Sequence, residues 1–82
     1  MKVSLFTTLG CHLCEDAVSI LLELVDELNI ELVEVEIADS DELVEKYGIR
    51  IPVILKEGAS EDLGWPFDSD GARRYLSAQV AR

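Results

Sequence analysis

The stretch KVSLFTTLGCHLC, residues 2–14, decides how this chain folds. Residues 2–7 alternate polar and apolar side chains up to Phe6, which predicts a β-strand. Gly10 breaks the strand, and Cys11 and Cys14 follow it directly. The stretch therefore predicts a strand that leads through a short turn to two cysteines three residues apart.

The residues after Cys11 have the spacing of an amphipathic helix over about residues 12–28. Apolar side chains recur at steps of three and four, at Ala17, Ile20, Leu21, Leu24, Val25 and Leu28. Glu15 and Asp16 in the first turn suit the positive end of the helix dipole. Both cysteines are thus predicted at the start of a helix.

A second strand and a short helix are predicted in the middle of the chain. Over residues 30–37, Val33, Val35 and Ile37 point one way while Glu34 and Glu36 point the other. Helix-capping residue types follow at Asp39 and Ser40, with Glu42 three residues after Asp39. The helix takes its apolar residues from Leu43, Val44 and Tyr47 and ends at Gly48.

The last third of the chain predicts a hairpin and a final helix. Strands over residues 49–55 and 61–65 flank a turn over 56–60, with Pro52 near the head of the first. Asp68 or Ser69 caps a helix over about residues 69–80. Its inward residues are Ala72, Tyr75, Leu76 and Val80.

These elements give the order β-α-β-α-β-β-α in one domain, residues 1–82. The first two strands flank a long helix and should form a right-handed parallel crossover. The last two should pair antiparallel. We therefore predict an α/β domain with a mixed four-stranded sheet and helices on both faces, which is the thioredoxin-like fold.

Composition excludes several classes of partner. The chain has 17 acidic and 7 basic residues and a net charge of -10, which disfavours nucleic acid and anionic membrane surfaces. No apolar run approaches the length of a membrane span, and the N-terminus lacks the pattern of a signal peptide. We expect a cytoplasmic monomer. The acidic residues Glu31, Glu34, Glu36, Asp41, Glu42 and Glu45 are interpreted as a solvated face.

The chain contains only two cysteines, Cys11 and Cys14. A disulfide between them closes a small loop and constrains little of the unfolded chain, so a reactive pair is favoured over a structural one. Unpaired N–H groups at a helix start stabilise a thiolate and lower its pKa from about 8.5 to about 3.5–7.5. Cys11 is the predicted nucleophile, and Cys14 is the predicted resolving thiol.

His12, between the two cysteines, has two open interpretations. A protonated imidazole would favour the Cys11 thiolate or donate a proton to a leaving thiol. Alternatively, His12 faces solvent and has little influence. Because the chain has no other Cys or His, a zinc or iron–sulfur site would need a carboxylate, a second chain or an outside thiol. We predict no bound metal or other cofactor.

The segments Thr7–Cys14 and Tyr47–Val53 resemble the active-site and cis-proline segments of glutaredoxin-like proteins, in particular a branch of short bacterial ones. The resemblance covers nearly the whole chain. It implies that Cys11 is the nucleophile, that Cys14 resolves and that Pro52 is cis. The backbone of Ile51 would then pair with a bound thiol peptide. Glutathione becomes a candidate co-substrate, and a reductase a candidate electron donor.

The chain departs from glutaredoxins around this motif. His12 and Leu13 replace the usual Pro-Tyr, no lysine precedes Cys11, and LGWPFD, residues 63–68, replaces a Gly-Gly turn with an acidic residue. Arg50 is a candidate for the missing positive charge, and Asp68 for contact with an amino group. Their alternatives are a solvated side chain for Arg50 and a helix cap for Asp68.

Trp65 and Phe67, on either side of Pro66, have two interpretations. They form either an apolar lip beside the cysteines or core anchors under the last helix. We predict core for Phe67, leave Trp65 open and include Trp65 among the candidate substrate contacts.

The sequence thus predicts a thiol–disulfide oxidoreductase that reduces protein or glutathione mixed disulfides. One alternative is a partner-specific binding module with the same fold. Another is a dimeric iron–sulfur or zinc carrier.

Overall fold

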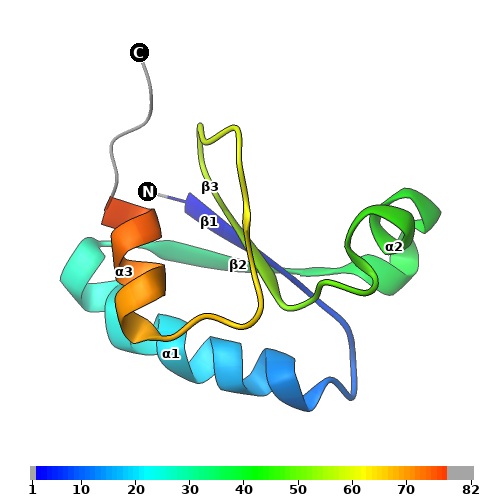
Figure 1. Ribbon diagram of the computed structural model, residues 1–82, viewed down its shortest axis with the longest axis horizontal. Coiled ribbons are helices and arrows are strands. Elements are labelled where there is room, and N and C mark those ends of the chain that lie inside the picture. Colours follow the sequence, from blue (N-terminus) through cyan, green and yellow to red (C-terminus); the bar gives the residue numbers. More distant parts are fainter. Residues whose placement is uncertain (1, 78–82) are drawn as a thin grey trace.

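The computed structural model describes residues 2–77 (Figure 1). Its elements are β1 (Lys2–Thr7), α1 (His12–Leu28), β2 (Glu31–Glu36), the 3₁₀ turn η1 (Ile37–Asp39), α2 (Asp41–Tyr47), β3 (Val53–Lys56), β4 (Leu63–Gly64) and α3 (Ser69–Ser77). The predicted order of strands and helices is confirmed. Within the described residues, no helix has both the length and the apolar character needed to cross a bilayer.

The four strands form one mixed sheet in the order β2-β1-β3-β4. β1 is parallel to β2 and antiparallel to β3, and β3 is antiparallel to β4. Phe6 in the central strand β1 pairs with Val35 on one side and with Val53 on the other. The predicted parallel crossover and C-terminal hairpin are both confirmed.

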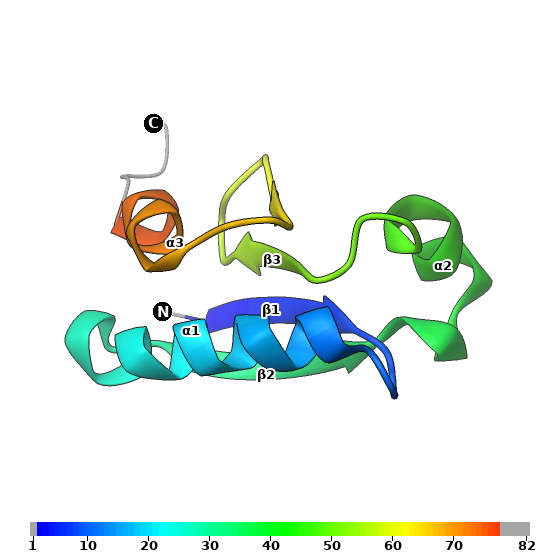
Figure 2. The ribbon, with the colours of Figure 1, turned by 60° about the horizontal axis from the view of Figure 1, so that its bottom comes forward.

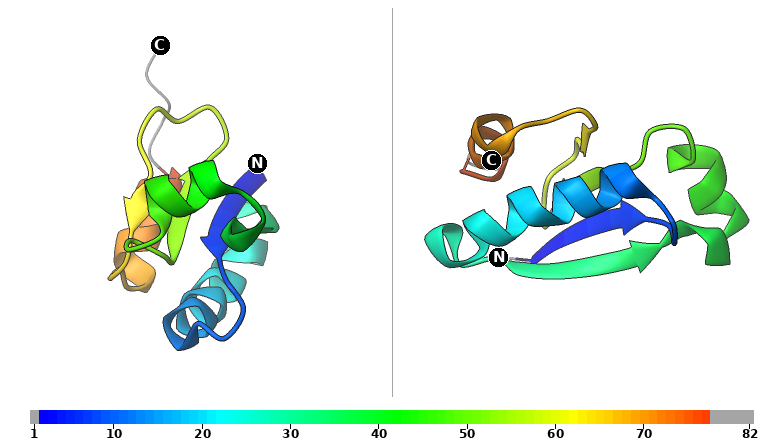
Figure 3. Two further views of the ribbon diagram at one scale, coloured as in Figure 1. Left: turned by 90° about the vertical axis from the view of Figure 1, so that its right-hand side faces the viewer. Right: turned by 90° about the horizontal axis from the view of Figure 1, so that it is seen from below.

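The sheet buries a different apolar cluster on each face. Leu5 and Ile54 belong to the cluster that α1 and α3 cover, whereas their neighbours Phe6 and Val53 belong to the cluster with Tyr47 of α2. Because successive side chains of a strand point to opposite faces, the two clusters lie on opposite sides of the sheet. Figures 2 and 3 show α1 running along β1 and β2, with α2 and α3 near opposite ends of the sheet.

Helix α1 has the predicted bounds and the predicted inward face. Ala17, Leu21 and Leu24 are 0%, 1% and 0% exposed. The helix ends at Asn29, which adopts the left-handed conformation and donates its backbone N–H to the Val25 carbonyl. Burial of Ala17, Leu21 and Leu24 holds the helix that begins at the cysteines against the sheet.

The second strand is shorter than predicted because the chain turns at Glu36. The Glu36 carboxylate accepts a hydrogen bond from the Ala38 backbone N–H at 3.0 Å, which begins the turn η1. Ser40, rather than Asp39, caps α2, since its hydroxyl accepts from the Leu43 N–H at 3.3 Å. The predicted strand over 30–37 was thus one residue too long at each end, since β2 spans Glu31–Glu36.

The third and fourth strands were also predicted too long. The Arg50 and Ile51 N–H groups both donate to the Tyr47 carbonyl, at 2.8 and 3.0 Å, and residues 48–50 form a turn. Pro52 has no N–H to donate, and pairing with β1 starts at Val53. β4 spans only two residues, Leu63 and Gly64. The predicted inward position of Val80 lies outside the described residues.

Tyr75 of α3 connects the helix to the hairpin. Its hydroxyl accepts a hydrogen bond from the Lys56 backbone N–H at 3.0 Å and donates one to the Glu61 carbonyl at 2.6 Å. Burial raises the pKa of Tyr75 above its ordinary value. The protein therefore holds this phenol in its neutral form.

Replacing Tyr75 by phenylalanine should lower the free energy of unfolding by about 1–2 kcal/mol, because two hydrogen bonds are lost. The pH profile gives a second readout. In the unfolded chain, Tyr75 has its ordinary pKa of about 10, which is lower than its pKa in the folded protein. Above about pH 10 the unfolded state therefore loses this proton first, and wild-type stability declines. Tyr75→Phe should lack that component.

Urea unfolding at neutral and alkaline pH measures both effects. Tyr47→Phe is the matched control, because it keeps the ring stacked on Phe6 at 4.2 Å and its hydroxyl has no hydrogen bond to other residues in the range 2–77. Equal losses in the two variants would contradict a bridging role for the Tyr75 hydroxyl.

Candidate active site

Cys11 is the N-cap residue of α1. Its backbone is extended, with φ -87° and ψ 106°, and its Sγ accepts a hydrogen bond from the Cys14 backbone N–H at 3.2 Å. The sulfur therefore occupies the position where a helix start presents unpaired N–H groups and partial positive charge. This placement agrees with the strand-turn-helix arrangement predicted from residues 2–14.

The two cysteines are joined by a disulfide, with their Cα atoms 5.2 Å apart. Their exposure differs, since Cys14 is 3% exposed whereas Cys11 is only half-buried. An incoming thiol can therefore approach Cys11 far more easily than Cys14. A pair with one accessible and one covered sulfur is suited to thiol redox chemistry.

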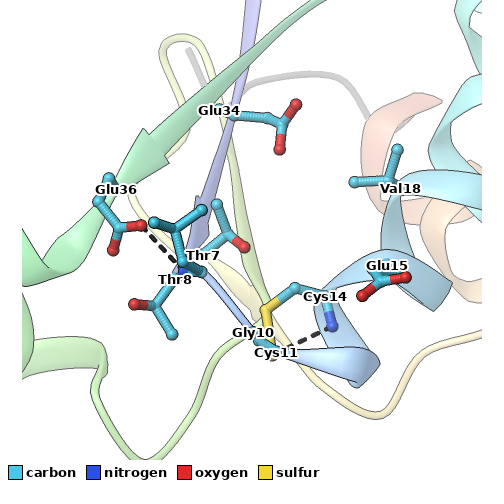
Figure 4. Close-up of a pocket in the computed structure, with 10 residues that line it drawn as sticks. Thr7, Thr8, Gly10, Cys11, Cys14, Glu15, Val18, Glu34 and Glu36 are labelled. Carbon is cyan, nitrogen blue, oxygen red and sulfur yellow. Dashed lines mark hydrogen bonds between the residues drawn. A yellow bond between two sulfur atoms is a disulfide. The ribbon is translucent and has the colours of Figure 1, made fainter.

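The disulfide borders a hollow of about 440 Å³ between α1 and the end of β2 (Figure 4). The lining residues are Thr7, Thr8, Leu9, Gly10, Cys11, Cys14, Glu15, Val18, Glu34 and Glu36. Figure 4 shows Glu34 and Glu36 of β2 on one side and Glu15 and Val18 of α1 on the other. The space beside the reactive pair is thus lined by three carboxylates and by no Lys or Arg of the described residues.

Glu36 holds the loop that leads into Cys11. Its carboxylate accepts backbone hydrogen bonds from Ala38 and Leu9, both at 3.0 Å. The hydrogen bond from Ala38, followed by those from the Thr8 side chain and Leu9, lowers the pKa of Glu36 below its ordinary value. Glu36 therefore stays charged beside the cysteines.

The sequence interpretation of both glutamates as part of a solvated face is confirmed for Glu34, which is exposed, but it missed the structural role of Glu36, which is only partly exposed. The position of Glu36 follows from strand pairing, because the parallel register of β1 and β2 sets Glu36 beside Thr7, four residues before Cys11. The crossover predicted the pairing of β1 with β2, but the sequence could not predict the register that brings Glu36 to the cysteine loop.

His12 does not line this hollow. Its side chain is 95% exposed, and its Nδ1 lies 3.8 Å from a Glu15 carboxylate oxygen whose side chain is 76% exposed. Contacts between such exposed groups contribute little to stability. A catalytic role for His12 stays a prediction.

The Ile51–Pro52 peptide bond is cis. Phe6 pairs with Val53, so Pro52, one residue earlier, lies near the end of β1 from which the chain reaches Cys11. Pro52 is buried, Ile51 is half-buried, and the Pro52 carbonyl accepts the Trp65 N–H at 3.0 Å. The fold thus places Ile51, Pro52 and Trp65 at the cysteine end of the sheet, although none of them lines the hollow.

Arg50 is paired with Asp62. Its Nη1 lies 3.2 Å and its Nη2 2.5 Å from the two Asp62 carboxylate oxygens. A Cβ on Gly64 would lie 3.2 Å from Nη2, so a glycine there leaves room for the guanidinium. Arg50 lines a second, separate hollow with Tyr47 and Asp62. Its contact with substrate stays a prediction, and the structure shows its charge already matched.

Asp68 and Trp65 both have structural contacts. The Asp68 carboxylate accepts from the Gly71 N–H at 2.7 Å and thereby caps α3, which is the alternative considered from the sequence. Trp65 is half-buried and meets Phe67 edge-on at 5.1 Å. Phe67 is 9% exposed, as predicted for a core residue. The Trp65–Pro66 bond is also cis, which the sequence did not predict.

Metal ligands do not gather within residues 2–77. No three His, Cys, Asp or Glu side chains come together there in an arrangement that could hold an ion. The prediction that the protein binds no metal stays a prediction.

Solved structures similar to this chain share its architecture. An X-ray structure of target protein XcR50 from X. campestris is 31% identical, with a TM-score of 0.79, and the match covers 94% of this chain and 97% of that one. The solution structure of XcR50 is 33% identical, with a TM-score of 0.77 and coverage of 99% and 100%. Protein Ne2328 from Nitrosomonas europaea is 28% identical, with a TM-score of 0.72 and coverage of 93% and 91%. No curated protein matches the chain.

The family comparison agrees with the site. Residues 2–77 match the model of the "Glutaredoxin-like domain (DUF836)" family. The match includes both cysteines, the cis-proline segment and all four strands. Because the match covers nearly the whole chain, this protein belongs to the glutaredoxin-like (DUF836) family and has the thioredoxin-like fold.

Proposed function

We propose that this protein is a thiol–disulfide oxidoreductase that cycles Cys11 and Cys14 between dithiol and disulfide. The observation that carries the proposal is the asymmetry of the pair. Cys11 is accessible at the start of α1, and its Sγ accepts a hydrogen bond from the Cys14 N–H at 3.2 Å. Cys14, in contrast, is only 3% exposed. An accessible nucleophile with a covered second thiol suits two-step disulfide exchange, because the substrate meets Cys11 first.

The exchange runs in two balanced steps. The Cys11 thiolate attacks one sulfur of a substrate disulfide, forming a mixed disulfide, and the displaced thiolate takes up a proton. The Cys14 thiolate then attacks Cys11 Sγ, the Cys11–Cys14 bond forms, and the second substrate thiolate leaves and is protonated. The substrate gains two electrons and two protons, which the dithiol loses.

The backbone around the pair supports both steps. The Cys14 N–H that donates to Cys11 Sγ stabilises negative charge on that sulfur. The Ile51 backbone, before cis-Pro52, lies at the same end of the sheet and can accept an extended substrate peptide. Either glutathione or a dithiol reductase would return the electrons.

The reduction potential of the pair tests the proposal. The protein is equilibrated with dithiothreitol and glutathione buffers, and free thiols are counted by alkylation and mass spectrometry. We expect a reversible transition within the range of redox enzymes, about -120 to -270 mV. A pair that stays oxidised below about -300 mV would behave as a structural disulfide and would overturn the proposal.

A further inference from the structure

We infer that the preferred substrates of this site are disulfides carried on basic polypeptide segments and that Glu34 selects them. The inference rests on the proposed function, because it concerns the substrate of the same cysteine pair. It follows from the charge and shape of the hollow beside the disulfide.

The three carboxylates of the hollow differ in how they are held. Glu36 is fixed by the Leu9 and Ala38 N–H groups, and Glu15 lies 3.8 Å from the exposed His12 ring. No hydrogen bond or ion pair joins the Glu34 side chain to any residue between 2 and 77. Glu34 is exposed, and Figure 4 shows its carboxylate on the β2 side of the hollow. It is therefore available to a cationic ligand.

Positive charge that could neutralise these carboxylates lies elsewhere in the described structure. Arg50 is paired with Asp62, and Arg73 with Glu27 and Asp70. None of the described lysines or arginines lines the hollow. The disulfide is thus approached through a region of negative potential, which attracts cationic substrates and repels anionic ones.

This charge distribution discriminates against glutathione. The tripeptide carries two carboxylates and one ammonium group at neutral pH, so its net charge has the same sign as the hollow. A peptide segment whose cysteine is flanked by lysines or arginines has a net charge of the opposite sign. Electrostatic complementarity of this kind changes the rate of association more than the affinity.

Apolar surface next to the cysteines favours a polypeptide over a small thiol. Leu9, two residues before Cys11, and Leu13, between the two cysteines, are 92% and 48% exposed. A peptide that extends beyond its cysteine can cover such side chains, whereas a tripeptide offers little apolar surface to them. The substrate that fits this surface is therefore a basic segment of a protein.

Three synthetic peptides test the inference. Each carries one cysteine as a mixed disulfide with 2-thiopyridine, a neutral leaving group whose release is followed by absorbance. The cysteine is flanked by lysines, serines or glutamates. Reduced protein attacks each peptide in a single turnover, and each rate is divided by the rate with 2-mercaptoethanol, which removes the intrinsic reactivity of the peptide.

The lysine peptide should react about tenfold faster than the glutamate peptide at about 0.01 M salt, and most of that ratio should disappear at about 1 M. Glu34→Gln should lower the ratio about two- to threefold, and Glu34→Lys should lower it further. Glu31→Gln is the matched control, because Glu31 is exposed on the same strand but pairs with Lys2 at the opposite end. It should leave the ratio unchanged.

Two results would overturn the inference. One is a ratio near one at low salt. The other is an equal effect of Glu34→Gln and Glu31→Gln, which would assign the preference to the overall charge of -10 rather than to the hollow. Failure of the proposed function looks different, since the serine peptide would then react no faster with wild type than with Cys11→Ser.

Discussion

Replacing Cys11 by serine should abolish turnover of mixed disulfides by this protein. The rate should fall to that of the uncatalysed reaction, a loss on the order of a hundredfold or more, because a serine hydroxyl does not attack a disulfide sulfur at neutral pH. Cys14 cannot take over, since it is 3% exposed. Release of peptide thiol from a neutral mixed disulfide, with dithiothreitol as the reductant, measures the effect.

Cys14→Ser should behave differently and serves as the comparison. This variant keeps the accessible nucleophile and loses only the resolving step, so it should accumulate a covalent adduct between Cys11 and substrate. Intact-mass spectrometry detects that adduct. Full turnover by Cys11→Ser, or an adduct on Cys14 instead of Cys11, would contradict the assigned roles.

The position of the cysteine pair could be predicted because its signals are local. A strand pattern, a glycine and a helix pattern lie within one continuous stretch, and the structure places Cys11 at the N-cap of α1 as that order requires. The inward face of α1 follows from its own spacing of apolar residues. Phe67, predicted as a core anchor under the last helix, is 9% exposed.

The surroundings of the pair depend on contacts between segments far apart in the sequence. Glu36 reaches Leu9 across 27 positions, and Arg50 meets Asp62 across 12. Neither pairing leaves a pattern in the residues themselves. Ile51 and Pro52 fit the start of a strand by residue type, yet β3 begins only at Val53, where pairing with Phe6 starts. Strand register, rather than propensity, decides these features.

Leu21→Ala should cause a large loss of stability. Leu21 is 1% exposed and packs in the cluster between α1, α3 and the sheet. Removing a buried leucine leaves a cavity and typically costs about 2–5 kcal/mol. A domain of this size has about 4–12 kcal/mol in total, so much of the stability is lost. Urea unfolding or calorimetry measures it, with Tm falling by about 4–8 °C per kcal/mol.

Leu22→Ala is the control for this prediction, because it makes the same chemical change one position further along the same helix. Leu22 is 60% exposed, so its truncation removes little buried surface and should change stability by no more than about 0.5 kcal/mol. Helix propensity is altered equally at both positions, so the difference between the two variants isolates burial against the sheet. If both variants lost the same stability, α1 would not bury the face that its sequence and the structure assign to it. The difference also bears on the redox site, since that packing fixes the helix whose first turn carries Cys11 and Cys14.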